Sequence, residues 1–253
     1  MVRFISAIAF VFVLAACAPG EDAQARQDAD LDRAEIEEIV RSYLVENPEV
    51  IEEALIELQR RRREQEQIAQ QNAIEAVSDR MYGDARDPVA GADDPAVRVV
   101  EFVDYRCSFC AVSNTWIQST LADHGDQVQF IFKEFPLRGP DALEASRAAL
   151  AVWRVTPDAY MAFHNGLFEA NGPLPSERID EIAEAAGVDV AAMRETMEGE
   201  AITEQLDEIR ALGREIGVRG TPFFIIGDTV VPGADMEALE RTLNAALEAA
   251  AGG

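Results

Sequence analysis

The sequence predicts an α/β domain with a helical subdomain inserted into it and a helical extension before it. Residues 97–103 form an apolar run rich in β-branched residues, which is typical of a buried strand, and a helical pattern follows at once. A second strand is expected at residues 127–132, and a long helical stretch separates it from an apolar strand at residues 223–226. This order of elements indicates an α/β architecture with an insertion.

The first residues have the pattern of a lipoprotein signal peptide. A short positive region ends at Arg3, and the apolar run after it is shorter than the about 20 residues that a membrane-spanning helix needs. The run ends in Leu-Ala-Ala-Cys, which resembles the bacterial lipobox and closes at Cys17. We expect residues 1–16 to be removed and Cys17 to carry a lipid. The alternative is an ordinary cleavage site that happens to precede a cysteine.

A helical arm is expected between a tether and the main domain. Residues 17–31 are polar without apolar periodicity and are typical of a flexible tether. Residues 32–82 then show helical spacing, with Asn47-Pro48-Glu49 reading as the boundary between two helices, the second running toward residue 81. The arm either pairs with copies of itself or is a solvated helix whose apolar start packs on its own domain.

Proline and glycine breaks in residues 83–96 mark the start of the main domain. We place this domain at residues 86–250 and its helical insertion at about residues 141–212. A short strand at residues 229–231 and an alanine-rich helix from Asp235 close it.

The charge of the chain excludes one class of partner. The chain has 22 basic and 47 acidic residues, and its net charge is −25. A chain of this charge repels nucleic acid, so no nucleic-acid partner is expected. The 48% of hydrophobic residues is enough for a real core.

The remaining cysteines point to redox chemistry. With Cys17 assigned to lipid, Cys107 and Cys110 are the other two thiols, and a disulfide across so short a loop stabilises little. Cys107 begins a helix after a strand, where unpaired backbone N–H groups stabilise a thiolate. We expect Cys107 to be the exposed nucleophile and Cys110 the more buried resolving thiol, with Ser108 and Phe109 shaping the helix start.

The same Cys-x-x-Cys spacing occurs in zinc sites, but tetrahedral zinc needs four ligands. The remaining candidates, His124 and His164, are forty residues apart and lack zinc-finger spacing. We therefore expect no metal. His124 is better explained as a group that complements a helix C-terminus, and His164 as a residue packed in the helical insertion.

Residues 100–110, with the Cys-Ser-Phe-Cys motif, and the downstream Gly-Thr-Pro segment resemble the DsbA-like branch of the thioredoxin superfamily. The resemblance implies a thioredoxin-like fold with an inserted helical subdomain. The N-terminal helical extension resembles that of Com1-like lipoproteins and ScsC-type proteins, some of which oligomerise through it. The family's strong oxidants carry Pro-His between the cysteines, and this sequence departs from them there.

The resemblance also implies roles for three further residues. Pro222 would follow a cis peptide bond and lie against the cysteine pair, and Thr221 would offer backbone groups to the substrate chain. Glu101, in the strand before the motif, would be a buried acid that handles protons for the resolving thiol. The alternatives are an ordinary trans turn for Pro222 and a surface strand position for Glu101.

These observations lead to the hypothesis of a thiol-disulfide oxidoreductase that forms, isomerises or reduces disulfides, with its own dithiol as its only cofactor. Expected partners are exported cysteine-containing proteins, a membrane redox partner and further copies of the chain, bound through the arm. The expected location is periplasmic and lipid-anchored to the cell envelope, and alanine rather than aspartate after Cys17 favours the outer membrane. The alternative is a noncatalytic envelope lipoprotein, a scaffold or holdase with a static disulfide.

Overall fold

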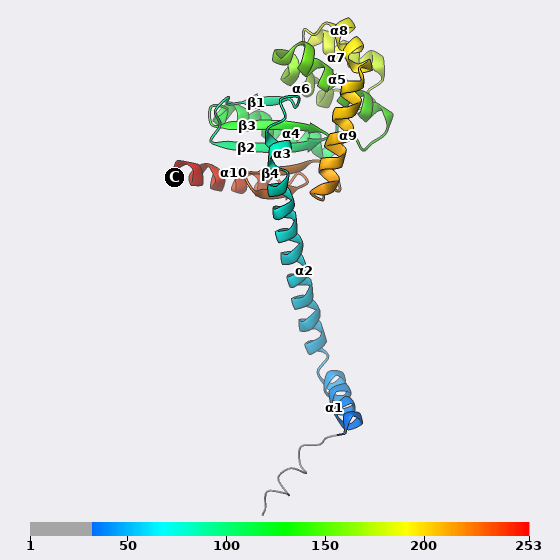
Figure 1. Ribbon diagram of the computed structural model, residues 1–253, viewed down its shortest axis with the longest axis vertical. Coiled ribbons are helices and arrows are strands. Elements are labelled where there is room, and N and C mark those ends of the chain that lie inside the picture. The colour runs from blue at the N-terminus through cyan, green and yellow to red at the C-terminus, as the bar shows by residue number, and fades with distance from the viewer. Residues whose placement is uncertain (1–31, 253) are drawn as a thin grey trace, which may run out of the picture. The chain divides into compact units, whose positions relative to one another are not determined.

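The computed structural model describes residues 32–252 (Figure 1). Cys17, the signal segment 1–16 and the tether 17–31 therefore lie outside the described residues. The described chain divides into two compact units between Arg63 and Glu64. Within residues 32–252, none of the helices combines the length and the apolar character needed to cross a membrane.

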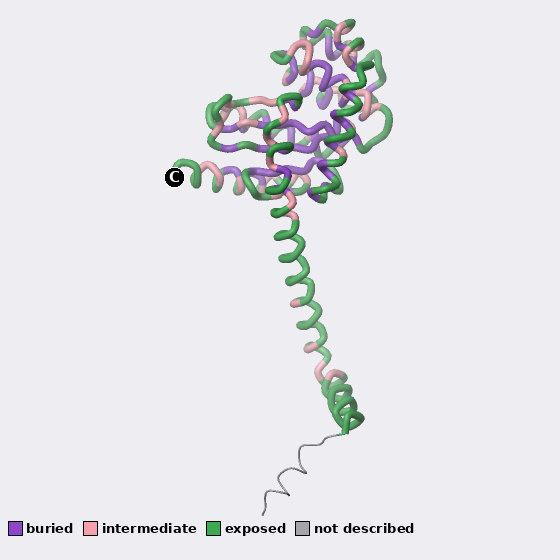
Figure 2. The backbone as a smooth tube through the Cα atoms, in the orientation of Figure 1, coloured by how far each residue is buried: buried purple, intermediate pink, exposed green. Residues whose placement is uncertain are grey.

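The N-terminal unit consists of α1 (Arg33–Glu46) and the first part of α2 (Glu49–Ala76). Asn47 ends α1 by donating a side-chain hydrogen bond of 2.8 Å to the carbonyl of Tyr43. No residue of α1 is buried, and Figure 2 shows most of the helix exposed. Large apolar side chains are nevertheless exposed on these two helices: Ile36, Ile39, Val40, Tyr43, Val45, Ile51, Leu55, Ile56 and Leu58.

A five-stranded mixed sheet forms the centre of the second unit, in the order β1-β3-β2-β4-β5. β2 and β3 are parallel, and the other neighbours are antiparallel. The strands are β1 (Val89–Gly91), β2 (Val97–Val103), β3 (Val128–Glu134), β4 (Phe223–Ile226) and β5 (Thr229–Pro232). β1 lies in the segment that was expected to contain only breaks. At three residues it is too short to show an alternating pattern.

Helices cover both faces of this sheet. The helical insertion follows β3, and its last helix, α9, runs from the insertion back to the sheet (Figure 1). The helices of the second unit are α3 (Ser78–Tyr82), α4 (Ser108–His124), α5 (Pro140–Val155), η2 (Pro157–Ala159), α6 (Tyr160–Glu169), α7 (Ser176–Ala185), α8 (Val190–Glu198), α9 (Glu200–Glu215) and α10 (Met236–Ala251). The expected single helix to about residue 81 is interrupted at Val77, where α2 gives way to α3.

Alternation along β2 divides the core between the two faces. Val99 and Val103 pack in the cluster that contains α4, α10 and much of the insertion. Val100 and Phe102 pack in the cluster that contains Ile74, Val77, Met81 and residues of α9. Because both faces are covered, six of the seven residues of β2 are buried (Figure 2). The end of α2 thus belongs to the core of the second unit.

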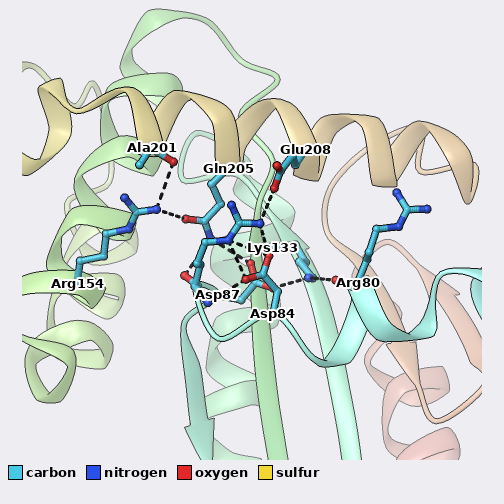
Figure 3. Close-up of polar contacts among 9 residues, drawn as sticks. Arg80, Asp84, Asp87, Lys133, Arg154, Ala201, Gln205 and Glu208 are labelled. Carbon is cyan, nitrogen blue, oxygen red and sulfur yellow. Dashed lines mark hydrogen bonds and ion pairs between the residues drawn. The ribbon is translucent and has the colours of Figure 1, made fainter.

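A buried ion pair stabilises the face that α9 covers (Figure 3). Lys133 of β3 pairs with Asp87, and each side chain is 1% exposed. Lys133 Nζ also donates to the carbonyl of Arg80 at 2.7 Å, and Gln205 of α9 donates to Asp87 at 3.3 Å. The pair and its hydrogen bonds therefore connect three parts of the chain, which are β3, α9 and the segment that follows α3.

Replacing Lys133 by Met should lower the free energy of unfolding by about 3–5 kcal/mol, because the Asp87 carboxylate would stay buried without its partner. Urea denaturation measures this loss. The double variant Lys133→Met, Asp87→Leu should recover most of it, since no charge is then left unpaired. Equal losses in the single and double variants would contradict the ion-pair explanation.

Candidate active site

Cys107 is the N-cap residue of α4, with extended backbone angles of φ −93° and ψ 114°. Its sulfur accepts hydrogen bonds from the backbone N–H groups of Phe109 and Cys110, which have no partner within the helix. The pKa of the Cys107 thiol is lowered to about 5, first by a hydrogen bond from the Cys110 thiol and then by Thr221 and these two N–H groups, against the opposing effect of burial. At neutral pH Cys107 is therefore a thiolate.

Cys110 lies one turn further along α4 and is completely buried. Its pKa is raised, first by burial, then because it donates its hydrogen to Cys107, and then by the negative charge of Glu101. The two thiols thus differ in protonation. The expectation that Cys107 is exposed is wrong, since Cys107 is only 1% exposed. The loop at Thr221 covers its sulfur on one side.

Glu101 of β2 lies on the sheet face that α4 covers and is 1% exposed. The Ser113 hydroxyl of α4 donates to Glu101 Oε1 at 3.3 Å, whereas Oε2 is buried without a partner among the described residues. Burial raises the pKa of the Glu101 carboxyl well above its ordinary value. The alternative of a surface strand position is therefore wrong. A carboxyl whose pKa is raised in this way is suited to exchanging a proton with a neighbouring thiol.

The Thr221–Pro222 peptide bond is cis, so the alternative of an ordinary trans turn is wrong. Cys107 Sγ lies 3.1 Å from the Thr221 carbonyl oxygen, to which it donates a hydrogen bond when the thiol is protonated. Pairing of β2 with β4 explains this contact between distant parts of the chain. Because Phe102 lies opposite Phe223 in an antiparallel register, the segment before β4 meets the segment after β2 at one end of the sheet.

A groove of about 900 Å³ opens beside Cys107. Its wall is mostly apolar and comes from α4, α6 and α10; it includes Ser108, Val112, Trp116, Leu167, Phe168 and Met236. Phe109 is not part of this wall, but it is 62% exposed beside the cysteines. The structure therefore assigns the two residues between the cysteines to different surfaces.

Asp104 is a site residue that sequence reasoning missed. Its buried carboxylate accepts from the backbone N–H of Arg106 at 2.7 Å and from those of Leu137 and Arg138 at 2.6 and 3.0 Å. It thereby ties the loop after β3 to the segment that leads into Cys107. An aspartate often accepts from the backbone N–H two residues later and so marks a turn, and this part of the arrangement can be found in the sequence. The contacts with residues 137 and 138 depend on the tertiary fold and cannot.

A buried polar cluster behind the groove was also missed. Glu134, at the end of β3, accepts from the hydroxyl groups of Tyr105 at 2.8 Å and Tyr160 at 3.2 Å. Burial raises the pKa of Glu134 to about 8 and lowers that of His164 to about 3, so His164 is a neutral imidazole. Its Nδ1 lies 2.9 Å from the Tyr105 hydroxyl. Within residues 32–252, no group of three or more His, Cys, Asp or Glu side chains could hold a metal ion.

Two family matches cover most of the described chain. Residues 98–244 match the family of DSBA-like thioredoxin domains. Residues 32–65 match the N-terminal domain of copper resistance protein ScsC. The first match contains the cysteine pair and the cis-proline, and the second corresponds to α1 and the beginning of α2.

Individual relatives agree with both matches. Disulfide bond formation protein D of Bacillus subtilis is 29% identical over 172 residues, which cover 64% of this chain and 77% of that protein. A linker-deletion mutant of ScsC from Proteus mirabilis is 30% identical, with a TM-score of 0.65 over 87% of this chain and 99% of that one. A periplasmic thioredoxin-like protein from Salmonella enterica is 28% identical, with a TM-score of 0.64 over 68% of this chain and 97% of that one.

The alkylation rate of Cys107 by iodoacetamide should rise through about pH 5 and stay level above it, because only the thiolate reacts. In Cys110→Ala the midpoint should move upward by about 1 to 2 units, since the hydrogen bond that lowers the pKa most is lost. Rates measured across a pH series test both expectations. An unchanged midpoint in Cys110→Ala would show that Cys110 does not stabilise the thiolate.

Proposed function

Because the chain belongs to the DSBA-like thioredoxin family of thiol-disulfide oxidoreductases, we propose that it exchanges disulfides with exported proteins through Cys107 and Cys110. The observation that carries this proposal is the contrast between the two thiols. Cys107 is a stabilised thiolate at a helix N-terminus, and Cys110 keeps its proton one turn away beside Glu101. Attack requires a thiolate, and resolution requires a second thiol within reach.

When the protein acts as an oxidant, a substrate thiolate attacks the Cys107 sulfur of the Cys107–Cys110 disulfide. The bond between the cysteines breaks, and Cys110 leaves and takes the proton of Glu101. A second substrate thiolate then attacks the substrate sulfur of the mixed disulfide, and Cys107 leaves as a thiolate. Two electrons pass from the substrate to the protein, so the dithiol is the only cofactor that the step needs.

In the reducing direction the same groups act in reverse. The Cys107 thiolate attacks a substrate disulfide, forms a mixed disulfide with one substrate sulfur and releases the other sulfur as a thiolate. Cys110 transfers its proton to the Glu101 carboxylate, which is ionised in this form, and then attacks Cys107, which releases the remaining substrate sulfur as a thiolate. Isomerisation uses the first of these steps, followed by attack from another thiol of the substrate. The low pKa of Cys107 makes it a good leaving group as well as a ready nucleophile.

The surroundings of Cys107 support an extended polypeptide as substrate. The Thr221 carbonyl lies 3.1 Å from Cys107 Sγ, and when Cys107 is a thiolate this carbonyl is a backbone acceptor that an N–H group of a substrate chain can pair with. The apolar groove on one side and the exposed Phe109 on the other would contact substrate side chains. These contacts are general rather than sequence-specific, which suits an enzyme that acts on many cysteine-containing proteins.

The arm supports assembly into oligomers. α1 and the first part of α2 expose large apolar residues, although a soluble helix normally covers such a face. This segment also corresponds to the match with the ScsC N-terminal domain. Isomerisation, in which several active sites act on one scrambled chain, is the activity that an oligomer favours, whereas disulfide formation needs only a monomer and a membrane partner that reoxidises it.

The proposed location is the periplasm. The Salmonella relative is described as periplasmic, and the predicted signal segment and Cys17 would export the chain and anchor it by a lipid. Alanine after Cys17 favours the outer membrane. In such an oxidising compartment, exported proteins with cysteines are the available substrates.

Oxidation of a reduced substrate protein and reshuffling of a scrambled one test the proposed activity. Wild-type protein should accelerate at least one of them, and Cys107→Ser should fall to the uncatalysed rate because the attacking sulfur is gone. Cys110→Ser should accumulate a mixed disulfide at Cys107. Equal rates for wild type and the double serine variant would favour the noncatalytic alternative.

A chain that begins at Glu64 should be monomeric and should lose isomerisation while keeping disulfide formation. The cut lies before Ile74, Val77 and Met81, so the core of the second unit is preserved. Light scattering and the scrambled-substrate assay measure the two effects. A full-length Tyr43→Glu, Leu55→Glu variant is the matched control, since both side chains are exposed and apolar. Unchanged isomerisation by a monomer would remove the main support for an isomerase.

A further inference from the structure

Arg138 reaches the reacting sulfur from outside the Cys-Ser-Phe-Cys motif. Its guanidinium Nη2 lies 3.9 Å from Cys107 Sγ. Arg138 belongs to the loop between β3 and α5, and the residues between the cysteines, Ser108 and Phe109, carry no charge. We propose that Arg138 is a further catalytic residue, whose guanidinium holds the negative charge of the Cys107 thiolate. The inference refines the proposed exchange reaction and rests on it.

The backbone at Arg138 is fixed by a group that also fixes the approach to Cys107. The buried Asp104 carboxylate accepts from the N–H groups of Arg138 and Leu137 and from that of Arg106, which immediately precedes Cys107. On the other side, Gly139 adopts a φ of 90°, which favours glycine, and Pro140 begins α5. The loop therefore has a defined course, although the Arg138 side chain is exposed.

The charge of Arg138 is available to the sulfur. Among residues 32–252, no carboxylate forms an ion pair with Arg138. The guanidinium of the neighbouring cation, Arg106, donates a hydrogen bond to the carbonyl of Gly172 at the groove. The other groups around the sulfur are the Cys110 thiol, Thr221 and, deeper in the core, the Glu101 carboxyl. Arg138 is thus a cation whose charge lies 3.9 Å from the Cys107 sulfur.

A positive charge at this distance acts differently on the two redox states. In the dithiol form, the guanidinium attracts the thiolate by an energy equivalent to about 1 pKa unit at a partly solvated site. In the disulfide form the sulfur carries no charge and this attraction disappears. Arg138 therefore favours the reduced state, makes Cys107 a better leaving group and makes the disulfide a stronger oxidant.

Thiolate absorbance in the ultraviolet, followed across a pH series on the purified reduced protein, tests the role of Arg138. In Arg138→Met the pKa of Cys107 should rise by about 1 unit. Arg138→Lys should keep most of the lowering, because it keeps the charge. Arg98→Met is the matched control: Arg98 is an exposed arginine and the second residue of β2, at the end of the strand away from Cys107, and its loss changes the net charge equally.

The inference would be overturned by an unchanged pKa in Arg138→Met, by equal rises in Arg138→Met and Arg138→Lys, or by an equal rise in Arg98→Met. An unchanged pKa in Arg138→Met would not bear on disulfide exchange by the wild type, so the proposed function would stand. Cooperative urea unfolding of each variant with an unchanged midpoint assigns a pKa shift to charge rather than to loss of structure. A wild-type Cys107 that titrates like a free cysteine would overturn both proposals.

Discussion

The hydrogen bonds that the Cys107 sulfur receives at the beginning of α4 are the interaction on which the site depends. They exist because β2 ends at Val103, a short turn held by Asp104 follows, and Cys107 then occupies the cap of the helix. A serine or aspartate in this place would be an ordinary helix cap. A cysteine turns the same geometry into a stabilised thiolate, so the chemistry follows from a local feature of the chain that the sheet holds in place.

Burial supplies the contrast that this thiolate needs. The same apolar surroundings that build the core raise the pKa of Cys110 and of the Glu101 carboxyl, so Cys107 loses its proton more readily than either of these inner groups. β2 can carry an acid here because α4 covers its face and provides the Ser113 hydroxyl. On the opposite face, Lys133 of β3 forms a buried pair with Asp87, and the contacts of this pair connect the end of the arm segment with α9 (Figure 3).

Local patterns predicted the elements that are defined by their own residues. The strands at residues 97–103 and 223–226 were predicted with the bounds that the structure gives, and the helix start at the cysteines follows from the same reasoning. The three-residue β1, the polar cluster at Glu134 and the approach of Arg138 to Cys107 depend on contacts between distant segments, which no local pattern encodes. The expectation that Cys107 is exposed, which followed from its role as nucleophile, failed because the covering loop at Thr221 lies 114 residues away in sequence.

The reduction potential of the Cys107–Cys110 pair, measured by equilibration with glutathione, tests most directly whether the capped thiolate controls the chemistry. A nucleophile with a pKa of about 5 lies between that of thioredoxin, at about 7, and that of DsbA, at about 3.5. The account therefore predicts a potential between about −270 mV and about −120 mV, the values of those two proteins. A potential at or below about −270 mV would contradict it, because the reduced form would then gain nothing from the thiolate.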